Sequence, residues 1–270
     1  MERFLHRLST SKHADRFVLK GALLLRVWNA PAVRPTMDID LLGRTSNDPA
    51  ALTRVIQDIC RQSVSADGLQ FDAESVVAQT MAEEADYQGV RLRFRGSLGT
   101  AKITMQIDVG LGDVITPQPS LVDYPTLFGD PAPRVLAYPR ETAVAEKFQV
   151  MLHRAQLNSR LRDYYDIWLL SRSFAFDGEL LASAIQKTCE RRGTEIPVEP
   201  IALTVAFAED PAKQTQWAAY RRKSQLEQAP QQLSDVVQAV AKLLSPISRA
   251  LGSGQRFGGT WQPPGPWTSS

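Results

Sequence analysis

Residues 34–42 read Arg34-Pro35-Thr36-Met37-Asp38-Ile39-Asp40-Leu41-Leu42, and they are the most informative stretch for the fold. Two carboxylates lie one residue apart in an otherwise apolar run. In a β-strand, Asp38 and Asp40 would share one face while Ile39 and Leu41 occupy the other. Like charges on one face repel, and Mg²⁺, which binds a few carboxylates together with substrate phosphates, would offset that repulsion. The stretch therefore predicts a metal site that handles phosphate.

The composition is that of an ordinary globular protein. The 270 residues are enough for one large domain or two small ones, and 43% are hydrophobic while 22% are charged. A formal net charge of only +2 excludes a strongly basic field over the whole surface. A nucleic-acid partner would therefore need a local basic patch, for example Arg91, Arg93 and Arg95 on one strand face.

The cysteines and the N-terminus bear on location. Cys60 and Cys189 have no nearby Cys or His at metal-ligand spacing, so we interpret both as buried thiols in a reducing compartment. The first residues lack the apolar core of a signal peptide. No run approaches the roughly 20 apolar residues of a membrane helix. We expect a cytoplasmic protein without a membrane partner.

The first half of the chain has α/β character. A strand at residues 17–19 leads through Lys20-Gly21-Ala22 into a helical run at 23–28, and Asp48 caps a helix that follows. The region 71–109 is strand-like. Residues 101–109 alternate strictly between polar and apolar, which places Asp108 on the polar face. This strand can lie beside the Asp38 strand and offer a third carboxylate.

The second half is helical in pattern. Helical spacing covers residues 139–155, 160–170, 177–193, 199–209, 212–224 and 231–251. The end of the chain after Gly252 is rich in Gly, Pro, Ser and Trp, which favours a flexible tail. We therefore predict an α/β domain over residues 1–138, a helical domain over 139–252 and a flexible tail over 253–270.

The acidic residues admit two interpretations. Three carboxylates converging from two strands would suit two metal ions, and the turn at Gly21 would present backbone N–H groups to phosphate. Alternatively, Asp-x-Asp is turn or surface chemistry, Gly21 is a simple turn residue, and Asp108 caps the Gly110-Leu111-Gly112 loop. The three features together in strand context favour the metal site.

A second group lies on the later helices. Lys147 on an amphipathic helix could neutralise triphosphate charge, or could be a solvated lysine paired with a nearby glutamate. Asp163 and Asp166 are three residues apart and share a helix face. They could orient Lys147 or contact substrate, or they could simply stabilise the positive end of the helix dipole.

The motifs taken together resemble the AbiEii/AbiGii-type nucleotidyltransferases. The resemblance rests on the ordered set of residues 17–23, 34–40, 106–110, 145–148 and 162–168, and it covers roughly Arg16 to Leu170. It implies an α+β fold: a polymerase-β-like nucleotidyltransferase domain, a mixed sheet with flanking helices, followed by an all-helical C-terminal domain. Family members include toxins of toxin–antitoxin and phage-defence pairs, and some relatives transfer nucleotides onto the acceptor end of tRNA.

The resemblance also implies roles for residues that match the motifs. An NTP and Mg²⁺ would be used, with an RNA acceptor and a cognate antitoxin as partners. Catalytic roles would fall to Asp38, Asp40, Lys147 and Asp166, nucleotide binding to Lys20, Gly21, Ala22, Thr36 and Asp163, and metal binding to Asp38, Asp40 and Asp108.

One departure keeps other functions open. The broader superfamily often has Gly-Ser where this chain has Gly21-Ala22, so one hydroxyl contact to phosphate is lost. The alternatives are a nucleotidyltransferase with a protein or small-molecule acceptor, and a module that binds nucleotides without turnover.

Overall fold

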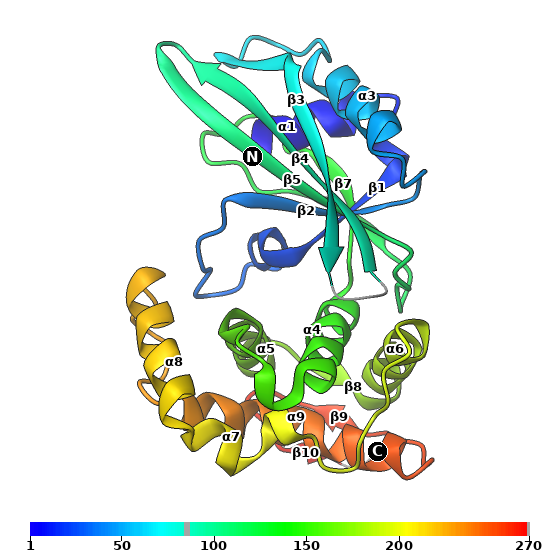
Figure 1. Ribbon diagram of the computed structural model, residues 1–270, viewed down its shortest axis with the longest axis vertical. Helices are drawn as coiled ribbons and strands as arrows, with labels where there is room; N and C mark the ends of the chain where they lie inside the picture. The colour runs from blue at the N-terminus through cyan, green and yellow to red at the C-terminus, as the bar shows by residue number, and fades with distance from the viewer. Residues whose placement is uncertain (84–86, 269–270) are drawn as a thin grey trace. The chain divides into compact units, whose positions relative to one another are not determined.

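A seven-stranded mixed sheet organises the first half of the chain (Figure 1) in the computed structural model, which describes residues 1–83 and 87–268. The strand order is β3-β4-β5-β2-β1-β7-β6. The strands are β1 (Phe17–Lys20), β2 (Asp38–Gly43), β3 (Leu69–Glu83), β4 (Tyr87–Leu98), β5 (Ala101–Leu111), β6 (Ser120–Asp123) and β7 (Arg134–Ala137). The strand-like region expected at 71–109 is confirmed, except for residues 84–86, which lie outside the described residues.

The chain divides into two units, and each is described by itself. The sheet unit comprises Met1–Asn29, Thr36–Asp113 and Pro119–Tyr138. The helical unit comprises Ala30–Pro35, Val114–Gln118 and Pro139–Ser270.

Parallel pairing of β2 with β5 is the feature of the sheet that positions the site. Strands β1 and β2 run antiparallel, whereas β2 lies parallel to β5 with Asp40 directly opposite Asp108. The alternating pattern of β5 is confirmed, because Met105, Ile107 and Val109 are buried. The polar residues between them therefore project from the opposite face of the sheet.

Helices cover the apolar face of this sheet (Figure 1). They are α1 (Glu2–Thr10) and α3 (Pro49–Cys60). The short α2 (Leu24–Val27) follows β1, and 3₁₀ turns lie at Ala14–Arg16 and Gly21–Leu23. The Phe4 ring of α1 packs 6.0 Å from Phe71 of β3 and 5.5 Å from Phe94 of β4, measured between ring centroids. Asp48 accepts hydrogen bonds from the N–H groups of Ala50 and Ala51, so the predicted cap of α3 is confirmed.

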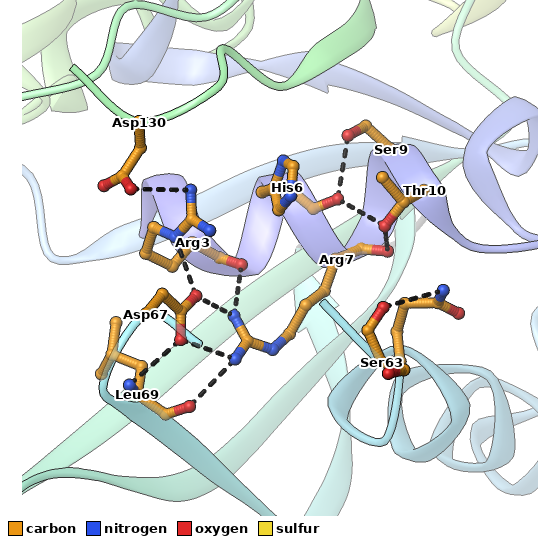
Figure 2. A network of polar contacts seen from close by, with 10 residues as sticks. Arg3, His6, Arg7, Ser9, Thr10, Ser63, Asp67, Leu69 and Asp130 are labelled. Atoms are coloured by element: carbon orange, nitrogen blue, oxygen red, sulfur yellow. Dashed lines mark hydrogen bonds and ion pairs between the residues drawn. The ribbon is translucent and has the colours of Figure 1, made fainter. Parts of the chain in front are cut away.

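A buried ion cluster fastens α1 to the start of β3 (Figure 2). Arg7 donates to both carboxylate oxygens of Asp67, at 2.7 and 3.0 Å, and Arg3 donates to Asp67 Oδ2 at 2.8 Å. Arg7 also donates to the carbonyl oxygen of Leu69 at 2.9 Å. The hydrogen bonds from Arg7 and Arg3 hold the pKa of Asp67 well below its usual range.

The helical unit contains most of the predicted helices. These are α4 (Arg140–Arg154), α5 (Leu161–Ser173), α6 (Gly178–Arg191), α7 (Val205–Glu209), α8 (Pro211–Lys223) and α9 (Leu233–Gly252), with 3₁₀ turns at Ala155–Leu157 and Ile201–Leu203. Asp177 caps α6 by accepting from the N–H of Leu180, as predicted. The helix expected at 199–209 is broken in two, because Thr204 is extended and caps α7.

The C-terminal tail differs from the sequence expectation. Strands β8 (Phe176–Asp177), β9 (Thr260–Trp261) and β10 (Trp267–Thr268) form a small three-stranded sheet, so this unit is not all-helical. Trp261 is 1% exposed and its indole N–H donates to the carbonyl of Ser171 at 2.7 Å. The indole N–H of Trp267 donates to the carbonyl of Leu243 at 2.9 Å. Burial of Trp261 and the hydrogen bonds of both indoles hold this segment against the rest of the helical unit, whereas the sequence predicted a flexible tail.

Within residues 1–83 and 87–268, no helix combines the length and the apolar character that a membrane span requires.

Candidate active site

Asp38 and Asp40 project from the same face of β2. The intervening Ile39 and the following Leu41 are 0% and 1% exposed, whereas both aspartates are only partly buried. The period of two in a strand explains this separation, as the sequence predicted. Two partly exposed carboxylates therefore stand together on the polar face of the sheet.

Gly21 lies directly against Asp40. Its φ of +73° is a left-handed conformation that favours glycine. A Cβ built at this position would lie 2.0 Å from Oδ2 of Asp40, far inside van der Waals contact. The backbone after β1 therefore approaches the Asp40 carboxylate so closely that only a glycine fits at position 21. This contact explains the glycine of the Lys-Gly-Ala pattern.

Asp108 is next to the pair in register but is bound by an arginine. Nε and Nη2 of Arg91 on β4 donate to its two oxygens at 2.8 and 2.7 Å. In the part of the chain that the structure describes, no three His, Cys, Asp or Glu side chains gather closely enough to hold a metal ion. Asp108 thus lies opposite Asp40 in register and binds Arg91, and metal binding by the three carboxylates stays a prediction.

The remaining predicted nucleotide-binding residues of the sheet unit lie in the same turn or next to Asp38. Lys20 is the register partner of Asp40, and its ammonium donates to Asp113 Oδ2 at 2.9 Å. Ala22 is buried in the 3₁₀ turn. The Thr36 hydroxyl lies 3.4 Å from the backbone nitrogen of Asp38. The sequence did not indicate Asp113, which follows a glycine-containing loop and lies 93 positions from Lys20.

Lys147, Asp163 and Asp166 come together in the helical unit. The Lys147 ammonium on α4 lies 2.9 Å from Asp166 Oδ2 and 3.4 Å from Asp163 Oδ1, both on α5. Arg160 forms a further ion pair with Asp163 at 3.1 Å. The Asp166 side chain is 1% exposed, and that of Lys147 is 15% exposed. Lys147 therefore forms ion pairs with both aspartates of α5, and a role for one of them in orienting Lys147 or contacting substrate stays a prediction.

Arg34 completes this cluster and was not assigned a role from the sequence. Its Nε donates to Asp166 Oδ1 at 2.7 Å and its Nη2 donates to Oδ2 at 3.0 Å. Burial alone would raise the pKa of the Asp166 carboxyl, but the charges and hydrogen bonds of Arg34 and Lys147 lower it to about 2. Asp166 is therefore an ionised, fully engaged carboxylate.

The predicted site residues thus form two groups. Asp38, Asp40 and Asp108 lie on adjacent strands of the sheet unit, with Gly21 against Asp40. Lys147, Asp163 and Asp166 lie on α4 and α5 of the helical unit. Hard carboxylate oxygens in the first group suit Mg²⁺. The second group, together with Arg34 and Arg160, contains three cations, and cations of this kind suit phosphate.

A family model described as the nucleotidyl transferase AbiEii toxin of type IV toxin–antitoxin systems matches residues 3–242, nearly the whole chain. The chain belongs to the AbiEii family. The suspected relationship is therefore confirmed, and membership indicates a nucleotidyltransferase that acts as the toxin of a toxin–antitoxin pair. AbiEii membership also implies a nucleotide substrate and an antitoxin partner.

Two solved structures are similar to this AbiEii protein. JHP933 from Helicobacter pylori is 12% identical, with 93% of this chain and 89% of that chain covered and a TM-score of 0.50. A putative nucleotidyltransferase from H. pylori is 14% identical, with coverage of 93% and 92% and a TM-score of 0.49. No curated protein sequence matches the chain. The first likeness supports the mixed α/β fold.

Proposed function

We propose that this AbiEii protein transfers a nucleoside monophosphate from an NTP to a hydroxyl of an RNA acceptor such as tRNA. The acceptor oxygen would bond to the α-phosphorus, the bond to the β-phosphate would break, pyrophosphate would leave, and the hydroxyl proton would pass to solvent. The observation that carries the proposal is the Asp38/Asp40 pair on one face of β2, with Gly21 packed against Asp40, in a chain of this family.

Asp38 and Asp40 are the proposed ligands of Mg²⁺. Their donor set fits the ion, because Mg²⁺ prefers carboxylate oxygens and keeps positions for substrate phosphates. When bound, Mg²⁺ would neutralise charge that develops on the phosphates. Asp108 is a proposed auxiliary third ligand, and it would contribute less than Asp38 and Asp40 because Arg91 already binds both of its oxygens.

The turn after β1 would receive the phosphates. Gly21 has no side chain, so its backbone can approach a ligand that lies beside Asp40. Lys20 and Ala22 flank Gly21 in this turn, and they would contribute one charge and backbone groups. Thr36, which contacts Asp38, would contribute a hydroxyl. Buried Ala22 offers no hydroxyl, so the phosphates would rely on N–H groups there.

Lys147 is the proposed triphosphate contact of the helical unit. Asp163 and Asp166 hold its ammonium by ion pairs at 3.4 and 2.9 Å. The ion pairs already restrict the side chain of this lysine, so less conformational entropy is lost when it binds an anionic substrate. Asp166 would therefore act on catalysis through Lys147.

Transfer of label from NTP to RNA tests the proposal. The purified protein would be incubated with each α-labelled NTP, Mg²⁺ and total tRNA, beside an Asp38→Ala/Asp40→Ala variant of matched folding. We expect labelled RNA with the wild type only. Absence of labelled RNA with every NTP would contradict an RNA acceptor.

The same reaction run in a whole-cell lysate separates the acceptors. Label on protein or on a small molecule would indicate the alternative acceptors. The missing hydroxyl at Ala22 favours a second candidate, a nucleotide-binding module without turnover. NTP binding by calorimetry without pyrophosphate release would support that candidate.

A further inference from the structure

Arg34 makes the most complete contact with Asp166. Two guanidinium nitrogens reach both oxygens, at 2.7 and 3.0 Å, in the fork geometry that Arg and carboxylate share. The side chains are 11% and 1% exposed. Oδ2 accepts from both Arg34 and Lys147, so Asp166 is occupied on both oxygens. It has little capacity left to ligate a metal or to accept a proton.

The segment that carries Arg34 is attached to α5 at two successive residues. Ala30–Pro35 belongs to the helical unit. The Tyr165 hydroxyl donates to the carbonyl of Ala32 at 2.6 Å, and the neighbouring Asp166 binds Arg34. These two contacts to α5 therefore fix the position of the guanidinium next to Asp166.

The charges of the cluster explain what Arg34 does for Lys147. Arg34, Lys147 and Arg160 face Asp163 and Asp166, so cations exceed carboxylates by one. If Arg34 were missing, Lys147 and Asp166 would form an isolated, buried ion pair. The carboxylate would then neutralise the charge of the lysine. With Arg34 present, Asp166 is already neutralised, and the Lys147 ammonium keeps charge for an anion.

We propose that Arg34 is a positioning residue for nucleotidyl transfer, which binds Asp166 so that Lys147 is oriented yet remains available to the triphosphate. The inference rests on the proposed function, because it takes the NTP as the anion that Lys147 meets.

Two variants separate charge from geometry. Arg34→Gln removes the charge, and we expect KM for NTP to rise by about 10–100-fold, the equivalent of losing charge-assisted hydrogen bonds. Arg34→Lys keeps the charge but not the fork, and we expect a smaller rise. Arg172→Gln is the matched control, because Arg172 is exposed and lies on α5, the helix that carries Asp166.

The pH dependence of kcat/KM distinguishes this positioning role from a purely structural one. The groups that act on Asp166 are Arg34 and Lys147, together with the hydroxyls of Tyr165 and Tyr220. Without Arg34, Lys147 would remain as the cation that offsets burial, so the pKa of Asp166 would be higher than in the wild type. Transfer requires the ionised carboxylate, so the acidic limit of kcat/KM should move to higher pH in Arg34→Gln and stay near that of the wild type in Arg34→Lys.

Steady-state kinetics over pH 4–9, with urea unfolding of each variant, tests the inference. A folded Arg34→Gln protein with raised KM and a shifted acidic limit supports it. A folded Arg34→Gln protein with the KM and pH profile of the wild type overturns it, as does an Arg172→Gln variant that is equally impaired. If Arg34→Gln does not fold, Arg34→Lys decides, and an unchanged KM there overturns the inference. Failure of the proposed function would show as an inactive wild type, so the two failures are distinguishable.

Discussion

The backbone at Gly21 and the carboxylate of Asp40 occupy adjoining space, such that a Cβ at position 21 would lie 2.0 Å from Oδ2 of Asp40. The two residues come from neighbouring antiparallel strands, where Lys20 and Asp40 are register partners. The turn therefore leaves no room for a side chain at position 21 beside the carboxylate.

Gly21→Ala should disturb the site as well as the fold. The left-handed φ of +73° costs about 1–2 kcal/mol for a residue with a Cβ, and Asp40 must also move. Gly129→Ala is a matched control, because its φ is +75° and nothing lies within 4 Å of the added Cβ. We expect comparable loss of stability from φ in both, but at least a tenfold loss of transfer only at Gly21. Equal activity of the two variants would contradict the role of the contact.

The carboxylates of the sheet unit should differ in importance. Loss of a metal ligand removes several kcal/mol of transition-state stabilisation, so Asp38→Asn and Asp40→Asn should each lower transfer about a hundredfold or more. Asp108→Asn should cost less than about tenfold, because Arg91 already engages that carboxylate. Mn²⁺ binding by electron paramagnetic resonance, measured beside transfer, checks this order. If Asp108→Asn abolished Mn²⁺ binding, Asp108 would be a ligand.

Asp67→Asn should destabilise the sheet unit at neutral pH. The substitution leaves Arg3 and Arg7, which are 7% and 6% exposed, without their carboxylate, and breaking such a buried pair costs about 3 kcal/mol or more. Because the pKa of Asp67 is lowered on folding, its contribution is present above the unfolded carboxyl pKa and is lost as pH falls.

Urea unfolding from pH 7 to pH 3 measures both effects. The difference between wild type and Asp67→Asn should shrink towards acid. A difference that stays constant across this range would show that the carboxylate charge is not the stabilising element. Asp123→Asn is a control, because its side chain is 69% exposed.

The C-terminal strands should be required for stability. Trp261→Ala empties a fully buried site and removes the hydrogen bond to Ser171, which should cost about 3–5 kcal/mol. Deletion of residues 257–270 should be at least as costly. Thermal unfolding followed by circular dichroism measures this. An unchanged melting temperature after the deletion would show that the segment contributes nothing.

The two cysteines should be inert in the folded protein. Burial raises the pKa of Cys60 and of Cys189 to about 12, so the thiolate is scarce at pH 8. We expect no labelling by iodoacetamide under native conditions and labelling of both thiols in urea, measured by mass spectrometry. Rapid native labelling of either thiol would mean that its surroundings open easily.

Local patterns in the sequence predicted much of the fold. Alternation in β5 predicted its buried face and its place beside the Asp38 strand, because one face of a strand must meet the core. Asp48 and Asp177 predicted helix starts, because a carboxylate at this position accepts the unpaired N–H groups of the first turn. These signals act within a few residues, so they can be read directly.

Contacts between distant residues could not be read in this way. Arg34 and Asp166 are 132 positions apart, and nothing near Arg34 in the chain indicates its partner. Arg91 was recognised only as part of a basic strand face, although it binds Asp108. The composition of the tail predicted flexibility, but the burial of Trp261 outweighs its glycines and prolines. In each case, tertiary packing determines the partner or the conformation, and the local composition does not.

The assignment of Ala30–Pro35 to the helical unit has a consequence for dissecting this protein. The chain passes from one unit to the other after Asn29, Pro35, Asp113, Gln118 and Tyr138, so no single scission separates them. A fragment that starts at residue 139 would carry Asp166 without Arg34, and the complementary fragment would carry an orphan guanidinium. Attempts to express the halves separately should therefore yield insoluble or unstable products, whereas co-expression of both pieces offers a route to reassembly.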